Sequence, residues 1–157
     1  MIFSVEWLKE FVDPEMELQS HAEELTMAGL EVDGLIPVAN DCTGIVVGEV
    51  TSVVKHPDAD KLSLCEVSDG ENSFQVVCGA ANVREGLKTP FAKVGAEIYS
   101  AKDEKPFKIK AAKIRGTESN GMLCSAEELG MAEASEGLLE LPEDAPVGED
   151  VRCYLKL

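Results

Sequence analysis

The sequence has little basic charge and few aromatic residues. Its 157 residues contain 14 Lys and Arg against 30 Asp and Glu, so the formal net charge is −16. Phosphate contacts need Lys and Arg, and this balance argues against a general nucleic-acid binder. Aromatic residues make up 5% of the chain, yet 45% of it is hydrophobic, which is enough to bury a core. We therefore expect one folded domain of ordinary size with a small appendage.

Membrane, targeting and metal signals are also lacking. No run approaches the roughly 18 apolar residues of a membrane span, and no basic and apolar leader follows Met1. We expect a cytoplasmic protein without a membrane partner that begins at its natural terminus. The cysteines are five in number and widely spaced, which predicts buried free thiols rather than a metal site: Cys42, Cys65, Cys78, Cys124 and Cys153.

Catalytic motifs are missing as well. The segment 116–121 misses the G-x-S-x-G nucleophile motif by one position, and no glycine-rich phosphate loop is present. His21 falls in a predicted helix and His56 in a Pro-Asp turn, which favours surface or packing roles for both. The sequence therefore predicts no catalytic, cofactor or metal residue.

Charge is distributed unevenly along the chain. Residues 84–115 hold nine basic and four acidic side chains, a local charge of +5. Residues 116–150 hold ten acidic side chains and no Lys or Arg. Such segregation could give the folded domain one basic and one acidic face, and the alternative is that the lysines are simply solvated side chains on strands.

The first 39 residues predict a small α/β appendage. A helix is expected over 4–12, capped by Ser4, and a second over 17–28, ended by Gly29 in the left-handed conformation. Residues 30–37 read as extended. The pattern changes near residues 38–41 from helical spacing to period-two alternation, which predicts a domain boundary.

Residues 40–150 predict a mainly β domain. Five strands are expected, over 44–54, 62–68, 73–78, 90–96 and 109–115, with a bend or bulge at Gly48. A short helix at Ser125–Gly130 and a last short strand at Leu138–Leu141 should follow. Short strands with turn signals and one short helix favour a five-stranded Greek-key barrel.

Three segments carry a family resemblance. HPDADKLSLCEVSDG at 56–70, QVVCGAANVREG at 75–86 and KIRGTESNGMLCSAEELG at 113–130 resemble the tRNA-binding domain of the OB (oligonucleotide-binding) type. IFSVEWLKEFVD at 2–13 and LTMAGLEVDG at 25–34 resemble the opening of bacterial phenylalanyl-tRNA synthetase β subunits. The resemblance implies an OB fold for residues 40–150.

The resemblance also implies partners. Such β subunits are longer, pair with a catalytic α subunit in an (αβ)₂ enzyme, and serve a reaction that uses ATP and Mg²⁺. The expected partners are therefore tRNA, the synthetase α subunit and the rest of the β subunit, with no cofactor in this segment. The chain is expected to be a fragment, with residues 151–157 packing back on residues 1–39.

Charge and resemblance together give candidate tRNA-binding residues. The cations are Lys61, Arg84, Lys88, Lys93, Lys113 and Arg115, and the polar residues are Asn82, Ser119, Asn120 and Ser125. Local roles are the alternative: Lys61 could pair with Asp58 or Asp60, Asn82 could shape a loop, and Ser125 could cap a helix. Tyr99 and Phe107 are stacking candidates, whereas Phe74 and Phe91 are expected in the core.

Three functions remain open. The first is a non-catalytic tRNA-binding module that positions tRNA and aids subunit assembly in aminoacylation. The second is a protein-interaction module with little RNA contact, which the charge of −16 favours. The third is a stand-alone tRNA-binding protein.

Overall fold

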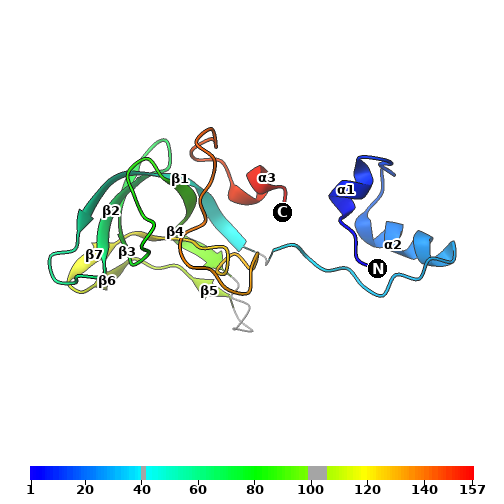
Figure 1. Cartoon of the computed structure of the whole chain (residues 1–157), viewed down its shortest axis with the longest axis horizontal. Helices are drawn as coiled ribbons and strands as arrows, with labels where there is room; N and C mark the ends of the chain where they lie inside the picture. Colours follow the sequence, from blue (N-terminus) through cyan, green and yellow to red (C-terminus); the bar gives the residue numbers. More distant parts are fainter. Residues whose placement is uncertain (40–41, 99–105) are drawn as a thin grey trace. The chain divides into compact units, whose positions relative to one another are not determined.

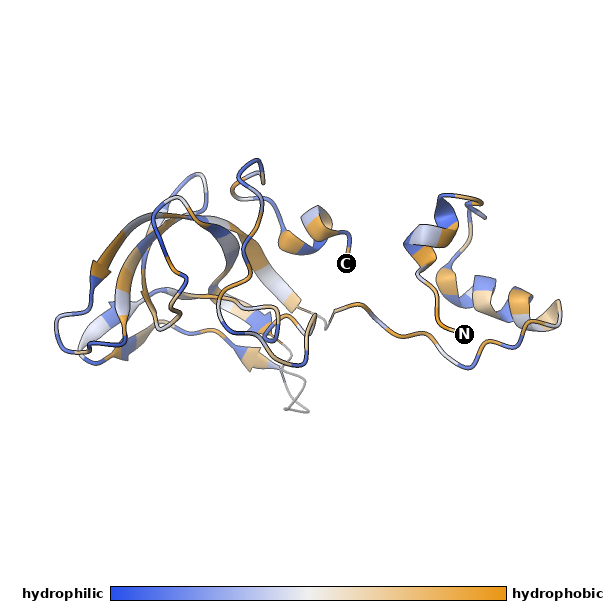
Figure 2. Cartoon of the chain, viewed as in Figure 1, coloured by the Kyte–Doolittle hydropathy of each residue, from blue (hydrophilic) through white to orange (hydrophobic). Residues whose placement is uncertain are grey.

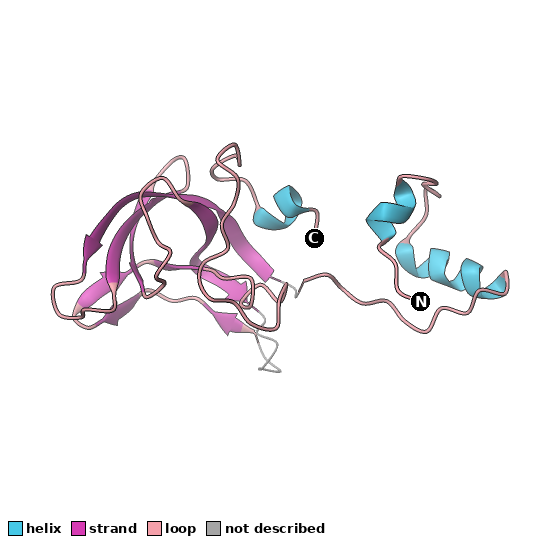
Figure 3. Cartoon of the chain, in the orientation of Figure 1, coloured by secondary structure: helices cyan, strands magenta, loops and turns pink. Residues whose placement is uncertain are grey.

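The computed structural model describes residues 1–39, 42–98 and 106–157. Contacts divide the chain into a first unit, Met1–Pro37, and a second unit, Val38–Leu157. The second unit is mainly β, with strands, long loops and one short helix (Figure 3). The division falls close to the boundary expected between residues 39 and 40.

The first unit contains two helices, α1 (Val5–Lys9) and α2 (Leu18–Met27). The predicted cap forms, since the Ser4 hydroxyl accepts a hydrogen bond from the Trp7 amide (3.4 Å), and Gly29 has the expected positive φ of 94°. The described residues of this unit contain no strand, so the predicted α/β character is wrong. Residues 30–37 have no neighbouring strand in this unit with which to pair.

The second unit is built on one strongly curled antiparallel sheet (Figure 1). Its strands follow the order β3-β2-β1-β4-β5, namely Ser73–Cys78, Ser63–Ser68, Cys42–Lys55, Lys88–Ile98 and Phe107–Lys108, and β8 (Gly121–Leu123) also pairs with β4. The long strand β1 pairs with β4 through its first half and with β2 through its second half. The two partners lie along opposite edges of β1.

The bends of β1 do not lie at Gly48, as the sequence had predicted. The register shifts between Thr43 and Ile45 and again between Val50 and Ser52. At Gly48 the pairing is regular, but a Cβ there would lie 2.6 Å from Cβ of Phe91. Glycine is therefore required at this position for the close approach of Phe91, rather than for a bulge.

The predicted strand at 109–115 is divided in two. Ile109 still exchanges hydrogen bonds with β4, donating to Ala96 and accepting from Gly95 (both 2.8 Å). The chain then leaves β4 and forms β6 (Ala112–Ile114), which pairs with β7 (Thr117–Ser119) in a separate hairpin. The predicted helix at 125–130 is only a turn, and the predicted strand at 138–141 is only a bridge between Leu141 and Lys88.

Strand β7 joins the two ends of the curled sheet. The Ser119 hydroxyl, 3% exposed, accepts from the Val77 amide on β3 and donates to the Gly121 carbonyl on β8, both at 3.1 Å. Gln75 strengthens the junction, because its side-chain amide donates to the Glu118 carbonyl (2.7 Å) and its own carbonyl accepts from the Asn120 amide (2.8 Å). Side-chain and backbone hydrogen bonds thus connect β3 to residues 118–121.

Two apolar clusters fill the curled sheet. Phe91 of β4, which is fully buried, belongs to the cluster formed mainly by residues of β1, β2 and β3. The other cluster includes Val151 from α3 (Val151–Leu155), a helix capped by Asp150, whose carboxylate accepts from the Arg152 amide (2.9 Å). The described contacts of this terminal helix are with β1, inside the second unit. Figure 2 shows apolar residues along the strands and mostly hydrophilic loops.

Candidate nucleic-acid interface

Most described cations of the segment 84–115 already contact other parts of the chain. Lys102 and Lys105 lie outside the described residues. Three of the others form ion pairs: Arg84 with Glu140 (2.7 Å), Lys93 with Asp69 (2.5 Å) and Lys108 with Glu97 (3.6 Å). Glu140 belongs to the acidic stretch 116–150, so the basic and acidic stretches are tied together at this point rather than separated onto two faces.

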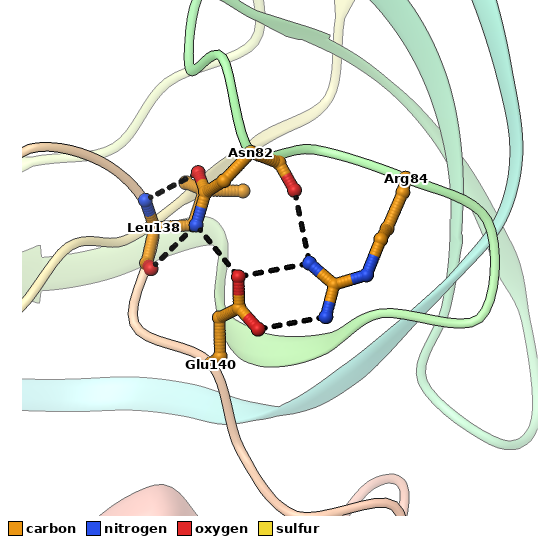
Figure 4. Close-up of polar contacts among 4 residues, drawn as sticks. All are labelled: Asn82, Arg84, Leu138 and Glu140. Carbon is orange, nitrogen blue, oxygen red and sulfur yellow. Dashed lines mark hydrogen bonds and ion pairs between the residues drawn. The ribbon is translucent and has the colours of Figure 1, made fainter.

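Asn82 and Arg84 form a polar cluster with the segment 138–140 (Figure 4). The Asn82 side-chain amide donates to the Leu138 carbonyl and to the Glu140 carboxylate (both 3.1 Å), and its oxygen accepts from the Leu138 amide (3.0 Å). Arg84 donates to both oxygens of Glu140 (2.8 and 2.7 Å). The Arg84 guanidinium, with Asn82, lowers the pKa of Glu140 to about 2. Both residues therefore hold two distant loops together.

Lys88 and Lys93 also have structural contacts. The Lys88 ammonium donates to the carbonyls of Glu143 (2.6 Å) and Ala145 (2.8 Å). Lys93 pairs with Asp69, whose side chain is 4% exposed and whose other oxygen accepts from the Asn72 amide (2.7 Å) in the β2–β3 turn. The hydrogen bond from Lys93, followed by that from Asn72, lowers the pKa of Asp69 to about 2.

Asp69 should make stability depend on pH. Its folded-state pKa of about 2 lies below the ordinary 3.8, so its contribution is present above pH 3.8 and is lost as the pH falls toward 2. We expect the free energy of unfolding to fall more steeply over this range in the wild-type protein than in Asp69→Asn, which has no carboxyl group to protonate. Urea unfolding at stepped pH values measures both slopes.

Lys93→Met provides the control for this prediction. It leaves the carboxyl group in place but removes the main cause of the lowered pKa, so its slope should lie between the other two. Equal slopes for the wild-type protein and Asp69→Asn would contradict the assignment.

The β6–β7 hairpin presents the candidates Lys113 and Arg115. Arg115 and Gly116 form its two-residue turn and have φ values of 50° and 83°. Lys110, Lys113 and Arg115 are all exposed, and none forms an ion pair with any residue in the described parts of the chain. These three side chains are therefore available to a ligand.

Lys61 lies at the same end of the sheet as this turn. It is exposed in the β1–β2 loop and has no ion pair among described residues, whereas its neighbour Asp60 pairs with Lys55 (2.7 Å). Ser63, just after Lys61, pairs with Cys78 at the end of β3. Asn120 contacts Gln75 and Ser119 contacts Val77, so the chain passes β3 in the opposite direction. Residues before Thr117 therefore lie toward the Cys78 end of β3 (Figure 1).

The polar candidates differ in accessibility. Ser119 is buried with its hydroxyl engaged on both sides, as described above. Ser125 forms the predicted capping box, donating its amide to the Glu128 carboxylate (2.5 Å) while its hydroxyl accepts from the Glu128 amide (3.3 Å), although the segment is a turn. Asn120 is half-buried, and its side chain has no hydrogen bond to a described residue. Four candidates are therefore available: Lys61, Lys113, Arg115 and Asn120.

In the described part of the second unit, no two exposed aromatic side chains pack together, whereas Trp7 and Phe11 of the first unit are exposed and in ring contact. Phe74 and Phe91 pack against each other with ring centroids 5.3 Å apart, and Phe91 is fully buried, as predicted. Phe107 on β5 is 59% exposed. Tyr99, the other stacking candidate, lies outside the described residues.

Several residues important to this region escaped the sequence analysis. Gln75, Asp69 and Glu140 make the contacts described above, and only Asp69 carried a signal, because an Asp-Gly pair marks a turn. Four cysteines are buried as predicted and burial raises the pKa of Cys65 to about 12, but Cys153 is exposed on α3. His56 is buried, and its Nδ1 accepts from the Asp58 amide (3.1 Å).

Within residues 1–39, 42–98 and 106–157, no group of three or more His, Cys, Asp or Glu side chains could hold a metal ion. No helix there is long and apolar enough to cross a membrane.

Comparison with known proteins gives consistent results over the chain. The model of the family described as "Putative tRNA binding domain" matches residues 45–150. Phenylalanine–tRNA ligase β subunits from Pseudomonas fluorescens (strain Pf-5) and Hahella chejuensis are 57% and 59% identical over all 157 residues. The chain spans 19% of the length of each of these relatives.

A solved structure, of a MetRS related protein from Pyrococcus horikoshii, is 28% identical. The match covers 67% of this chain and 85% of that one, with a TM-score of 0.47.

Proposed function

Since this chain belongs to the tRNA-binding domain family and matches phenylalanine–tRNA ligase β subunits over its whole length, we propose that it is their non-catalytic tRNA-binding module. In this role it positions tRNA for aminoacylation. The family match over residues 45–150 is the observation that carries the proposal, because it coincides with the curled sheet of the second unit.

We propose that the second unit is a five-stranded Greek-key OB barrel. The strand order β3-β2-β1-β4, the long bent β1 and the closure of β3 onto β7 support this proposal. We also propose the domain division expected from the sequence, with an appendage at 1–39 and the OB domain at 40–150.

Four of the ten candidate residues are proposed to contact tRNA. Lys61, Lys113 and Arg115 are exposed and lie toward one end of the sheet, and Asn120 is half-buried beside Gln75 of β3. The other six are proposed to position these elements, because their side chains already bind the protein: Asn82, Arg84, Lys88, Lys93, Ser119 and Ser125.

Assembly is the second proposed role. The first unit exposes large apolar side chains, with Trp7 56%, Phe11 72% and Met27 88% exposed. Apolar surface of this kind favours contact with protein. The proposed partners are the synthetase α subunit and the rest of the β subunit, where ATP and Mg²⁺ would be used.

A salt-dependent titration tests the tRNA proposal. We expect the chain to bind tRNA at about 50 mM salt and to bind it much more weakly at about 200 mM, because phosphate contacts release counterions. Fluorescence anisotropy of labelled tRNA measures both affinities. No binding at the lower salt, or an affinity indifferent to salt, would contradict direct contact with tRNA.

The same protein tests assembly. Association with the α subunit is measured for the wild-type chain and for Lys61→Ala/Lys113→Ala/Arg115→Ala. Loss of tRNA affinity with unchanged association would show that the two roles use different surfaces. Unchanged tRNA affinity in this variant would contradict the proposed contact residues.

A further inference from the structure

One edge of the second unit consists entirely of exposed residues. The segment 110–116, which includes β6, has no buried side chain. Strand β6 pairs with β7 on one side only, and β7 in turn contacts β3. The segment therefore forms an extended, solvent-facing rim that contributes nothing to the described core.

The rim contains those described cations of the segment 84–115 that form no ion pair or side-chain hydrogen bond with a described residue. Arg84, Lys93 and Lys108 have carboxylate partners, and Lys88 has two carbonyl partners. Lys110, Lys113 and Arg115 have no such partner among described residues, and Glu118, opposite Lys113, is the one acid in 110–118. The rim 110–116 thus carries a charge of +3, or +2 when Glu118 is included, in a chain whose net charge is −16.

The turn of this hairpin contains a residue that is poorly suited to its conformation. A two-residue turn with positive φ at both positions favours Asn-Gly. Gly and Asn adopt this left-handed conformation readily, whereas the Cβ of most other residues crowds the backbone there. The first position is Arg115, with φ of 50°, and its side chain forms no hydrogen bond or ion pair with a described residue that would offset the strain. A strained, exposed cation with no structural task indicates a binding role.

The rim itself contains no base-stacking group, and the exposed Phe107 lies outside it on β5, which pairs with β4. Residues 110–118 contain no aromatic side chain. Binding of single-stranded RNA commonly uses aromatic side chains on which bases stack, whereas contact with a helical segment can use phosphates alone.

From these observations we propose that the rim 110–116 binds the sugar–phosphate backbone of a double-helical RNA segment through Lys110, Lys113 and Arg115. The proposal rests on the tRNA-binding function proposed above and narrows it to one element and one chemical group. Recognition at this rim is independent of base sequence.

The test compares two triple variants with the same loss of charge. The rim variant is Lys110→Ala/Lys113→Ala/Arg115→Asn. The control is Lys9→Ala/Lys108→Ala/Lys156→Asn, which alters two cations with carboxylate partners and one exposed cation at a positive φ of 56°. Each variant therefore has two alanines and one asparagine in the left-handed conformation.

We expect the rim variant to bind tRNA at least about 10-fold more weakly at about 100 mM salt. The slope of log affinity against log salt should fall by about 2–3, since each lost contact with a duplex phosphate lowers it by about 0.9. The control should keep the wild-type slope to within about 1. Equal slopes in the rim variant and the wild-type protein would overturn the proposal, and absence of wild-type binding would overturn the function on which it rests.

The single variant Arg115→Asn tests whether misfolding, rather than loss of charge, causes the weaker binding of tRNA. Because Asn-Gly suits this turn, its Tm should equal or exceed that of the wild-type protein while the salt slope falls by about 0.9. A lower Tm would contradict the reading of Arg115 as a strained residue.

Competitors identify the form of RNA. A short RNA duplex should displace tRNA from the wild-type chain, and the rim variant should bind this duplex as weakly as it binds tRNA. If oligouridine displaces tRNA and the duplex does not, the rim does not act through helical backbone and the proposal fails.

Discussion

Replacing Gly121 with alanine is expected to destabilise the second unit by about 3–5 kcal/mol, the sum of overpacking and of strain at positive φ. Gly121 is buried at the start of β8 with φ of 143°. A Cβ there would lie 2.8 Å from the Ala92 carbonyl oxygen and would overlap the ring of Phe91. Phe91 is fully buried between strands, so its ring has no free space into which to move.

Urea unfolding followed by circular dichroism measures this loss. Gly34→Ala is the control, because a Cβ at Gly34 meets no atom within 4 Å and its φ is not positive. It should change the free energy of unfolding by less than about 0.5 kcal/mol. A loss below about 1 kcal/mol in Gly121→Ala would show that β8 can move away from Phe91.

The second large effect is expected at Asn82. Asn82→Asp keeps the shape of the side chain but removes both donors to Leu138 and Glu140, and it places a carboxylate beside that of Glu140. We expect a loss of about 1–3 kcal/mol, because the half-buried hydrogen bond to the Leu138 carbonyl is lost and two like charges meet. Chemical denaturation at neutral pH measures it.

Asn82→Ala, examined in parallel, separates the two causes. It removes the hydrogen bonds without adding charge and should therefore be less damaging than Asn82→Asp. The affinity of the folded fraction for tRNA gives a second test. If this affinity falls in Asn82→Ala while stability does not, Asn82 contacts tRNA directly and its structural role is minor.

The parts of the fold that depend on neighbouring residues were predictable from the sequence. Ser4 caps α1 because the acceptor and the amide it serves are three residues apart. The β2–β3 hairpin is likewise local, since alternating strands flank an Asp-Gly turn. Phe74 and Phe91 were placed in the core by the same alternation.

The remainder depends on contacts between distant residues. The pattern at 109–115 suits a strand, but the sequence does not reveal that β8 occupies the next part of the β4 edge and forces the chain away after Ile109. Gly48 was predicted to mark a bend because the close contact that requires glycine there is made with Phe91, which comes from another strand and is not evident from the local sequence. The same holds for Arg84, whose apparent availability disappears once Glu140, far along the chain, is placed beside it.

The segments that pair with β1 are made at different times during protein synthesis. Its partners arrive in succession: β2 follows directly, β4 begins at Lys88, and the edge at Val46 and Val47 is completed by Glu149 and Asp150, about 100 residues later. At about 5–20 residues per second, the ribosome needs roughly 5–20 s to supply them. Until β4 has been made, the first half of β1 has no partner strand, and the edge at Val46 and Val47 waits for residues 149–150. The nascent chain is therefore most exposed to aggregation or chaperone binding before β4 emerges.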